Sequence, residues 1–317
     1  MTNVDMDVKT KHHNRRGLVQ YLLLSAKGFC MGASDVVPGV SGGTMAFILG
    51  IYEELIDAIR SFDIRSARLL FTFKIRAFLN AVSWRFLLSV GIGILVAIFT
   101  LARGLAWLLE NEPVLIWSFF LGLILASVIT VSRRVKHRGY GTWFSFFLGL
   151  AGIYLLVGLV PGSTPNHALF LFISGATAIC AMILPGISGS FILVLLGKYQ
   201  FILEAVNHRD VGVLFIFMAG AVVGIIVFSR LLGWLLNRYH DLMVAFLIGL
   251  MLGSLRKIWP WKEAIETAVD RHGNGIPLVQ MNTLPAAFSS EVALAVALMV
   301  VGFFVVMLLD WMAGKAG

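Results

Sequence analysis

A Pro-Gly break inside a long apolar run constrains this chain most, and it occurs twice. The first copy reads Pro38-Gly39-Val40-Ser41-Gly42-Gly43-Thr44, and the second reads Pro185-Gly186-Ile187-Ser188-Gly189-Ser190. Proline lacks an amide donor and glycine adopts almost any φ, so each pair interrupts a helix. At membrane depth, irregular backbone is tolerated only where protein buries it or where it lines a wet cavity. Two such breaks in matching positions therefore indicate a transport site.

The composition is that of a polytopic helical membrane protein. Of the 317 residues, 59% are hydrophobic and 13% are charged, and the mean hydropathy is +0.89. Apolar runs long enough to span a bilayer recur along the chain. The net charge of +8 lies mostly in loops. It indicates the positive-inside rule rather than nucleic-acid binding. Cys30 and Cys180 fall in apolar segments and suggest neither a disulfide framework nor a metal site.

The chain also repeats itself. Ten apolar segments can be marked, at 18–33, 36–59, 86–109, 113–131, 142–160, 168–184, 186–206, 212–236, 242–258 and 291–312. A series recurs 147 positions later, namely Pro38, Gly39, Ser41, Gly42, Gly50, Tyr52 and Ala58. A second series recurs 127 positions later, namely Arg103, Trp107, Gly122 and Ser127. A basic linker at 60–85 in the first half accounts for the change of offset. We interpret the chain as two repeats of five segments each.

The predicted fold class is an all-α polytopic membrane protein built from two inverted repeats. Five segments per half give an odd number of crossings, whether the broken pair is a re-entrant hairpin or two spans, so the second repeat is inverted. Each repeat is expected to hold one re-entrant helical hairpin and three transmembrane helices. Repeat 1 covers 17–160, with its hairpin at 18–59 and helices at 86–109, 113–131 and 142–160. Repeat 2 covers 161–312, with its hairpin at 168–206 and helices at 212–236, 242–258 and 291–312.

Loop charge sets the expected orientation. The tail 1–16, the linker 60–85 and the loop after 131 are rich in Lys and Arg, which places them and both termini in the cytoplasm. The C-terminal tail is 313–317. The polar stretch 259–290 falls outside. Three cations contradict the rule because they lie on the outer side: Arg256, Lys257 and Lys262.

Each break starts a new helix within the membrane, whose first amides and dipole favour an anion. The candidate substrate-binding residues are Ser41, Gly42, Gly43, Thr44, Ser188, Gly189 and Ser190. The alternative is that these glycines only permit tight helix packing. Arg103 and Arg230 are further candidates, because they occupy equivalent repeat positions and guanidinium groups bind phosphate. Snorkelling beside a Trp explains them equally well.

Ionisable residues near the hairpins are candidates for coupling transport to a proton or a sodium ion. Asp35 lies three residues before the first break and could instead pair with Lys27; its counterpart in the second copy is Met182. The remaining coupling candidates, Glu53, Glu54, Asp57 and Glu204, fit solvated helix ends as well. No catalytic group, metal site or cofactor is indicated.

The run from Gly28 to Thr44 resembles the signature of the bacterial polyprenyl-phosphate transporter family, long catalogued as a domain of unknown function. The second copy, Leu184 to Ser190, fits that family too. The resemblance covers roughly 17–311. It implies a multi-pass protein of the bacterial inner membrane that returns undecaprenyl phosphate from the outer to the inner leaflet. The carrier lipid can then serve again in peptidoglycan and other envelope polymers.

Two other functions would use similar broken-helix motifs. Membrane phosphatases acting on undecaprenyl pyrophosphate also carry broken-helix Pro-Gly-x-Ser motifs, but there the serine precedes Arg-Ser-Gly. Here Gly42-Gly43 and Gly189-Ser190 follow the serines, and no group is spaced for general acid-base catalysis. A transporter of a small inorganic anion would use the same hairpins. It would keep its cavity closed to lipid.

Overall fold

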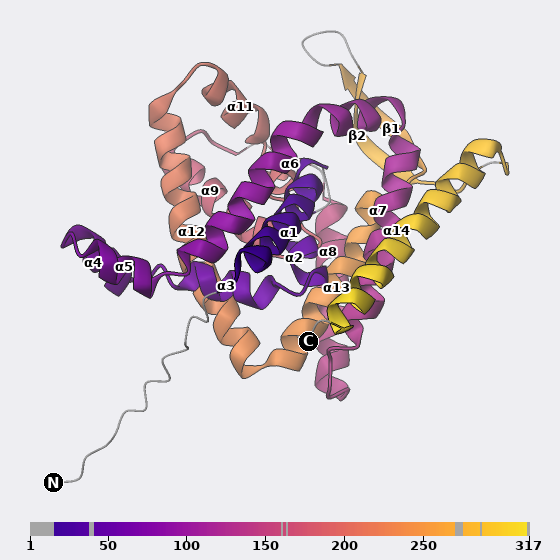
Figure 1. Ribbon diagram of the computed structural model, residues 1–317. Coiled ribbons are helices and arrows are strands. Elements are labelled where there is room, and N and C mark those ends of the chain that lie inside the picture. Colours follow the sequence, from indigo (N-terminus) through magenta and orange to yellow (C-terminus); the bar gives the residue numbers. More distant parts are fainter. Residues whose placement is uncertain are drawn as a thin grey trace.

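The computed structural model, shown in Figure 1, describes residues 16–37, 41–159, 161–162, 164–269, 275–285 and 287–315. The first residues of the first break, Pro38 to Val40, lie outside the described residues, and so do most of the tail 1–16 and the last two residues. The first half of the chain contains α1 (Leu18–Val36), α2 (Gly42–Ile48), α3 (Tyr52–Arg60), α4 (Ile64–Phe71), α5 (Ile75–Ala81), α6 (Trp84–Asn111), α7 (Pro113–Ser132) and α8 (Tyr140–Val157). The second contains α9 (Ala168–Ile183), α10 (Gly189–Leu195), α11 (Tyr199–Asn207), α12 (Val211–Arg238), α13 (His240–Ile258), β1 (Lys262–Val269), β2 (Gly275–Asn282) and α14 (Ser290–Lys315).

The long helices confirm a multi-pass membrane protein. Among the described residues, five helices are long and apolar enough to cross a bilayer, and they are α6, α7, α8, α12 and α14. The bent pair α10 and α11 would raise the number to six if it were one span. The predicted spanning helix 242–258 corresponds to α13, which has 19 residues but carries Asp241, Arg256 and Lys257. Its middle is buried in the protein, which lessens its need for an apolar surface.

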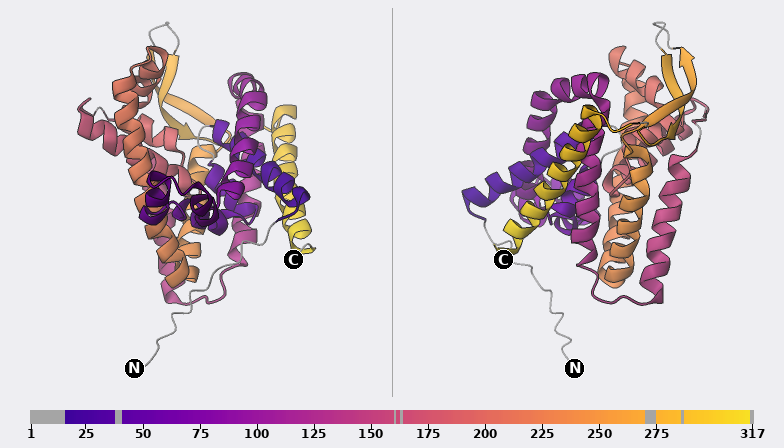
Figure 2. Two further views of the ribbon diagram at one scale, coloured as in Figure 1. Left: turned by 60° about the vertical axis from the view of Figure 1, so that its left-hand side comes forward. Right: turned by 90° about the vertical axis from the view of Figure 1, so that its right-hand side faces the viewer.

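Two parts of the chain differ from the sequence prediction. The polar stretch 259–290 contains an antiparallel pair, β1 and β2, with register irregularities between Ala264 and Thr267, so the chain is not entirely helical. The basic linker 60–85 is not a plain linker, because it forms the short helices α4 and α5. Asp63 caps α4 by accepting a hydrogen bond from the Ser66 amide. Figure 2 shows the β-pair at one end of the molecule and the C-terminal end of α14 at the other.

The long helices pack in pairs through glycines. Helix α1 lies against α6, and a Cβ added to Gly28 would fall 2.2 Å from the Val90 carbonyl oxygen. Helix α9 lies against α12, and a Cβ on Gly175 would fall 2.1 Å from the Phe217 carbonyl oxygen. The other two pairs are α7 with α14 and α8 with α13. Only small residues allow membrane helices to approach this closely.

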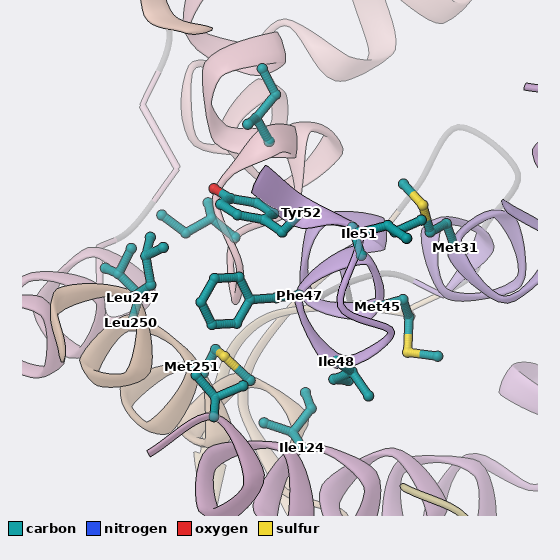
Figure 3. Packing of buried hydrophobic residues seen from close by; sticks show 14 of the residues in the cluster. Met31, Met45, Phe47, Ile48, Ile51, Tyr52, Ile124, Leu247, Leu250 and Met251 are labelled. Carbon is teal, nitrogen blue, oxygen red and sulfur yellow. The ribbon is translucent and has the colours of Figure 1, made fainter. Parts of the chain in front are cut away.

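The short helix α2 lies at the centre of the core. All seven of its residues are buried. Figure 3 shows Phe47 between Tyr52 and Met251 of α13, with Ile124 of α7 beyond Met251. The Phe47 and Tyr52 rings meet edge to face, with centroids 4.9 Å apart, a geometry that aromatic quadrupoles favour. Helix α2 therefore lies in the middle of the bundle rather than at its surface.

Each short helix ends at a glycine elbow. Gly50, after α2, has φ +70°, and Gly197, after α10, has φ +64°. This left-handed region costs a residue with a Cβ energy, whereas glycine adopts it readily. The chain turns sharply at these points, and α10 and α11 are bent by 108°. The two glycines are related by the 147-residue offset of the sequence repeat.

Candidate functional site

The two copies of the motif lie in direct contact at the centre of the molecule. The Ser41 hydroxyl is 3.1 Å from the Met182 carbonyl oxygen and 3.3 Å from that of Leu184, and its one proton can be donated to either. In return, the Gly186 amide donates to Thr44 Oγ1 at 2.9 Å. Residues about 140 positions apart are therefore hydrogen-bonded across the two breaks.

Gly43 makes this contact possible. A Cβ at this position would fall 2.4 Å from the Ile183 carbonyl oxygen, which belongs to rigid backbone. The glycines thus allow tight packing between the two motif copies, as the alternative interpretation of the sequence expects. Gly42 has another role, because its amide donates to Asp35 Oδ1 at 2.7 Å.

We expect the hydroxyls at this contact to stabilise the fold. Ser41→Ala leaves the Gly43 amide without its cap, and Thr44→Val leaves the buried Gly186 amide without its acceptor. Each change should cost about 1–2 kcal/mol, measured as a lower thermal unfolding midpoint of the purified protein in detergent.

The matched control is Ser188→Ala. The Ser188 hydroxyl has a hydrogen bond to Ser190 Oγ, at 2.8 Å, and no bond across the contact among the described residues. Its loss should therefore lower the midpoint less than either of the other changes. Equal shifts for all three variants would contradict the assigned role of the contact.

Helix α1 holds both ends of α2. Asp35 accepts from the first amide of α2, and Lys27 Nζ donates to the Leu49 carbonyl at the other end, at 2.9 Å. The two side chains are eight positions apart, roughly 12 Å along a helix, which matches the length of α2. A carboxylate at the N-terminus and an ammonium at the C-terminus both complement the helix dipole. Asp35 and Lys27 thus each bind α2, instead of pairing with each other.

The second motif copy lacks this arrangement. The counterparts of Asp35 and Lys27 are Met182 and Ser174, which supply no charge. No residue of α10 is fully buried, in contrast to α2. The residues of the first copy from Ser41 to Thr44 are thus buried, and α1 caps their helix. In the second copy, Gly189 and Ser190 are partly exposed.

The two repeat-related arginines do not converge on this contact. Arg103 on α6 and Arg230 on α12 are both exposed. This position fits the snorkelling interpretation.

The acidic candidates lie mostly on the surface. Glu53 pairs with His240 at 3.2 Å, Glu54 with Arg16 at 2.8 Å, and Asp57 with Arg60 at 3.2 Å. Glu204 is exposed near the end of α11. Asp35 differs from these four because it is enclosed between α1 and α2.

The site residues predicted from the sequence did not include Lys198 or a second group of three cations. Lys198, at the elbow before α11, is fully buried and donates to the Thr164 carbonyl and to Asn166 Oδ1. The second group comprises Arg256 and Lys257 in the last turn of α13 and Lys262 at the start of β1. Their conflict with the positive-inside rule was visible in the sequence, and it was the available signal for them.

Comparisons with known proteins agree with the resemblance. The polyprenyl-phosphate transporter of Vibrio cholerae serotype O1 is 42% identical over 303 residues, which cover 94% of this chain and 98% of the relative. The polyprenyl-phosphate transporter of Staphylococcus aureus is 31% identical over 252 residues, covering 74% and 84%. Both names describe transporters rather than enzymes. No solved structure matches the chain. The model of the family described as undecaprenyl phosphate translocase-like matches residues 31–276, and the chain therefore belongs to that family.

Proposed function

We propose that this protein moves undecaprenyl phosphate from the outer to the inner leaflet of the bacterial inner membrane, which returns the carrier lipid for peptidoglycan synthesis. A phosphate monoester must then cross hydrocarbon, and an unpaired ion there costs, in the idealised limit, on the order of 20 kcal/mol. The contact between the two motif copies, through Ser41 and Thr44, carries the proposal. It places polar, broken backbone at the centre of an otherwise apolar bundle.

Paired contacts support the inverted repeat. Gly122 of α7 packs on the Met299 carbonyl of α14, and its counterpart Gly249 of α13 packs on the Phe146 carbonyl of α8. The same holds for α1 with α6 and for α9 with α12. The pair of α7 with α14 and the pair of α8 with α13, which join the two halves, are thus related by exchange of the halves, as a pseudo-two-fold axis requires.

The lengths of the short helices support re-entrant hairpins. Helices α2 and α10 have 7 residues each, or about 10 Å, against a hydrocarbon thickness of about 30 Å. Neither can complete a crossing. The sharp elbows at Gly50 and Gly197 instead let α3 and α11 turn away from the direction of the short helices. On this proposal the two hairpins enter from opposite faces and meet at the middle.

The two halves differ in how the helix after each glycine elbow packs. Helix α3 packs on α12, and a Cβ on Gly233 would fall 2.5 Å from Arg60 Nη1. Helix α11 makes no comparable contact with α6, and Figure 1 shows α11 apart from the end of α6 that leads into α7. Tyr52 and Ile56 on α3 are each 1% exposed, while their counterparts Tyr199 and Leu203 are 40% and 44% exposed.

The same difference appears on the partner helices. The face of α12 under α3 is buried at Ser229, Leu232, Gly233 and Leu236. The corresponding face of α6 is wholly or partly exposed at Ala102, Leu105, Ala106 and Leu109. We propose that this conformation is closed on the cytoplasmic side and open on the outer side. In the opposite state, α11 would close on α6 as α3 now does on α12.

The proposed phosphate cradle is formed by the two motif copies in turn. In this conformation the second copy, with Ser188, Gly189 and Ser190, is the more accessible and receives the phosphate first. The first copy becomes available when the Asp35 carboxylate leaves the Gly42 amide. Asp35 is accordingly the proposed carrier of the coupling proton or sodium ion.

The test is a reconstitution assay. Purified protein in liposomes should move labelled undecaprenyl phosphate between leaflets, with release of inorganic phosphate followed in parallel. Movement without release is expected. Release without movement would instead indicate a phosphatase. Uptake of inorganic phosphate without lipid movement would indicate a transporter of small anions.

A further inference from the structure

Two lysines form an unusual pair beside the second hairpin. Lys257 lies in the last turn of α13, Lys262 begins β1, and Lys262 Nζ donates to the Lys257 carbonyl. Lys257 Nζ lies 5.2 Å from the centroid of the Phe191 ring. Lys262 Nζ lies 4.9 Å from that of Trp117. Three separate elements, α7, α10 and α13, therefore surround these two ammonium groups.

Neither ammonium group is neutralised within the described part of the chain. Both side chains are partly buried, and no ion pair joins either to a carboxylate among the described side chains. Burial and the positive charge of Lys257 lower the pKa of Lys262 to about 8. Two half-buried like charges repel each other, and aromatic faces hold cations without cancelling their charge. Such a pair is suited to an anion that arrives from elsewhere.

The position of the pair connects it to the substrate path. Phe191 follows Ser190 directly, so Lys257 reaches the first turn of α10. The turn at Gly186 packs on α13 near Leu250, where a Cβ would fall 2.8 Å from the Leu250 carbonyl oxygen. Helix α13 therefore runs from the motif contact to the lysine pair, along the more accessible of the two hairpins.

Arg256 belongs to a different surface. Its guanidinium lies 4.5 Å from the centroid of the Tyr154 ring and donates to the Tyr154 carbonyl oxygen. These contacts hold it against α8, on another side of α13 from Phe191. It has the same formal charge at a neighbouring position, which makes it a matched control.

We propose that Lys257 and Lys262 bind the phosphate monoester of the substrate on the outer side, before it reaches the second hairpin. This inference rests on the proposed function and adds the residues that first receive the headgroup. Ammonium groups bind phosphate oxygens by charge-assisted hydrogen bonds. The prenyl chain would remain in the lipid, because only the headgroup carries the recognised charge.

Binding to the purified full-length chain in detergent provides the test. Lys257→Gln and Lys262→Gln should each weaken binding of undecaprenyl phosphate about tenfold or more. Lys257→Arg should retain binding within about threefold, since the charge is kept. Arg256→Gln should leave affinity unchanged. Inorganic phosphate should compete in the wild type and compete more weakly in both glutamine variants.

The outcomes separate the two proposals. If the wild type does not bind undecaprenyl phosphate, the proposed function fails. If the wild type binds and both glutamine variants match it while remaining folded by size exclusion, the lysine site is overturned. If the variants lose only inorganic phosphate, the pair binds free phosphate and the lipid assignment is wrong. If a glutamine variant is misfolded, Lys257→Met takes its place, because it keeps the apolar part of the side chain and removes the charge; wild-type affinity in that folded variant would overturn the lysine site.

Discussion

Linking α11 to α6 should stop transport completely, and reducing the link should restore it. Arg60 over Gly233 is the contact that closes α3 on α12. The repeat-related pair is Asn207, which lies 147 positions after Arg60, and Ala106, which lies 127 positions before Gly233. Cysteines at Asn207 and Ala106, in a chain whose own cysteines are replaced by alanine, would hold the outer side closed. Because a substrate cannot pass a transporter locked in one state, lipid movement should fall to the level of protein-free liposomes.

The matched control is the pair that is already in contact. Cysteines at Arg60 and Gly233 should link readily in the resting protein, whereas those at Asn207 and Ala106 should link slowly. The rate for the second pair should rise when undecaprenyl phosphate is present, because turnover populates the opposite state. Equal linking rates for both pairs without substrate, or full transport with Asn207 and Ala106 linked, would contradict the proposed alternation.

Much of this organisation was accessible from the sequence because the repeat carries it. The apolar runs predicted a multi-pass membrane protein, and the resemblance of the run from Gly28 to Thr44 predicted its family; both predictions are confirmed. The glycines at 50 and 197, which the sequence repeat relates, also share a left-handed backbone. Pairing and inversion of the halves remain a proposal.

The local misses have physical reasons. Strand β2 contains Pro277, which cannot donate to a ladder, and neither strand alternates cleanly, so 259–290 gave no two-residue period. Helix α4 did leave a signal, since Asp63 and Ser66 form a capping box at its start. That signal was missed because basic residues dominate the linker.

The site was less predictable than the fold. The bond from Ser41 to Met182 joins residues 141 positions apart, and no local pattern specifies such a partner. Sequence spacing also could not show that Lys27 and Asp35 bind opposite ends of α2. Repeat symmetry even misleads here, because it suggests two equivalent cradles. In the structure, a carboxylate caps the short helix of the first motif copy and none caps that of the second, among the described residues.

Replacing Asp35 should have the second large effect on lipid transport. We expect Asp35→Asn to fold normally and to reduce lipid transport at least about tenfold. The amide oxygen of asparagine can still accept from the Gly42 amide, so the cap on α2 survives. The substitution removes the negative charge, and therefore also the ability to bind a proton or a sodium ion. The measurement is initial transport rate in liposomes, with a proton gradient and a sodium gradient imposed separately.

Glu54→Gln is the appropriate control for this change. It also removes one negative charge from the first hairpin, but Glu54 pairs with Arg16 at a partly exposed site, where such pairs contribute little. Its transport rate should stay close to that of the wild type. Asp35→Leu removes charge and cap together, and should lower both the unfolding midpoint and the rate. If Asp35→Asn transports at the wild-type rate while Asp35→Leu unfolds early, Asp35 is a structural cap alone. Coupling would then have to depend on another residue, because the capping bond to Gly42 would account for all that Asp35 does.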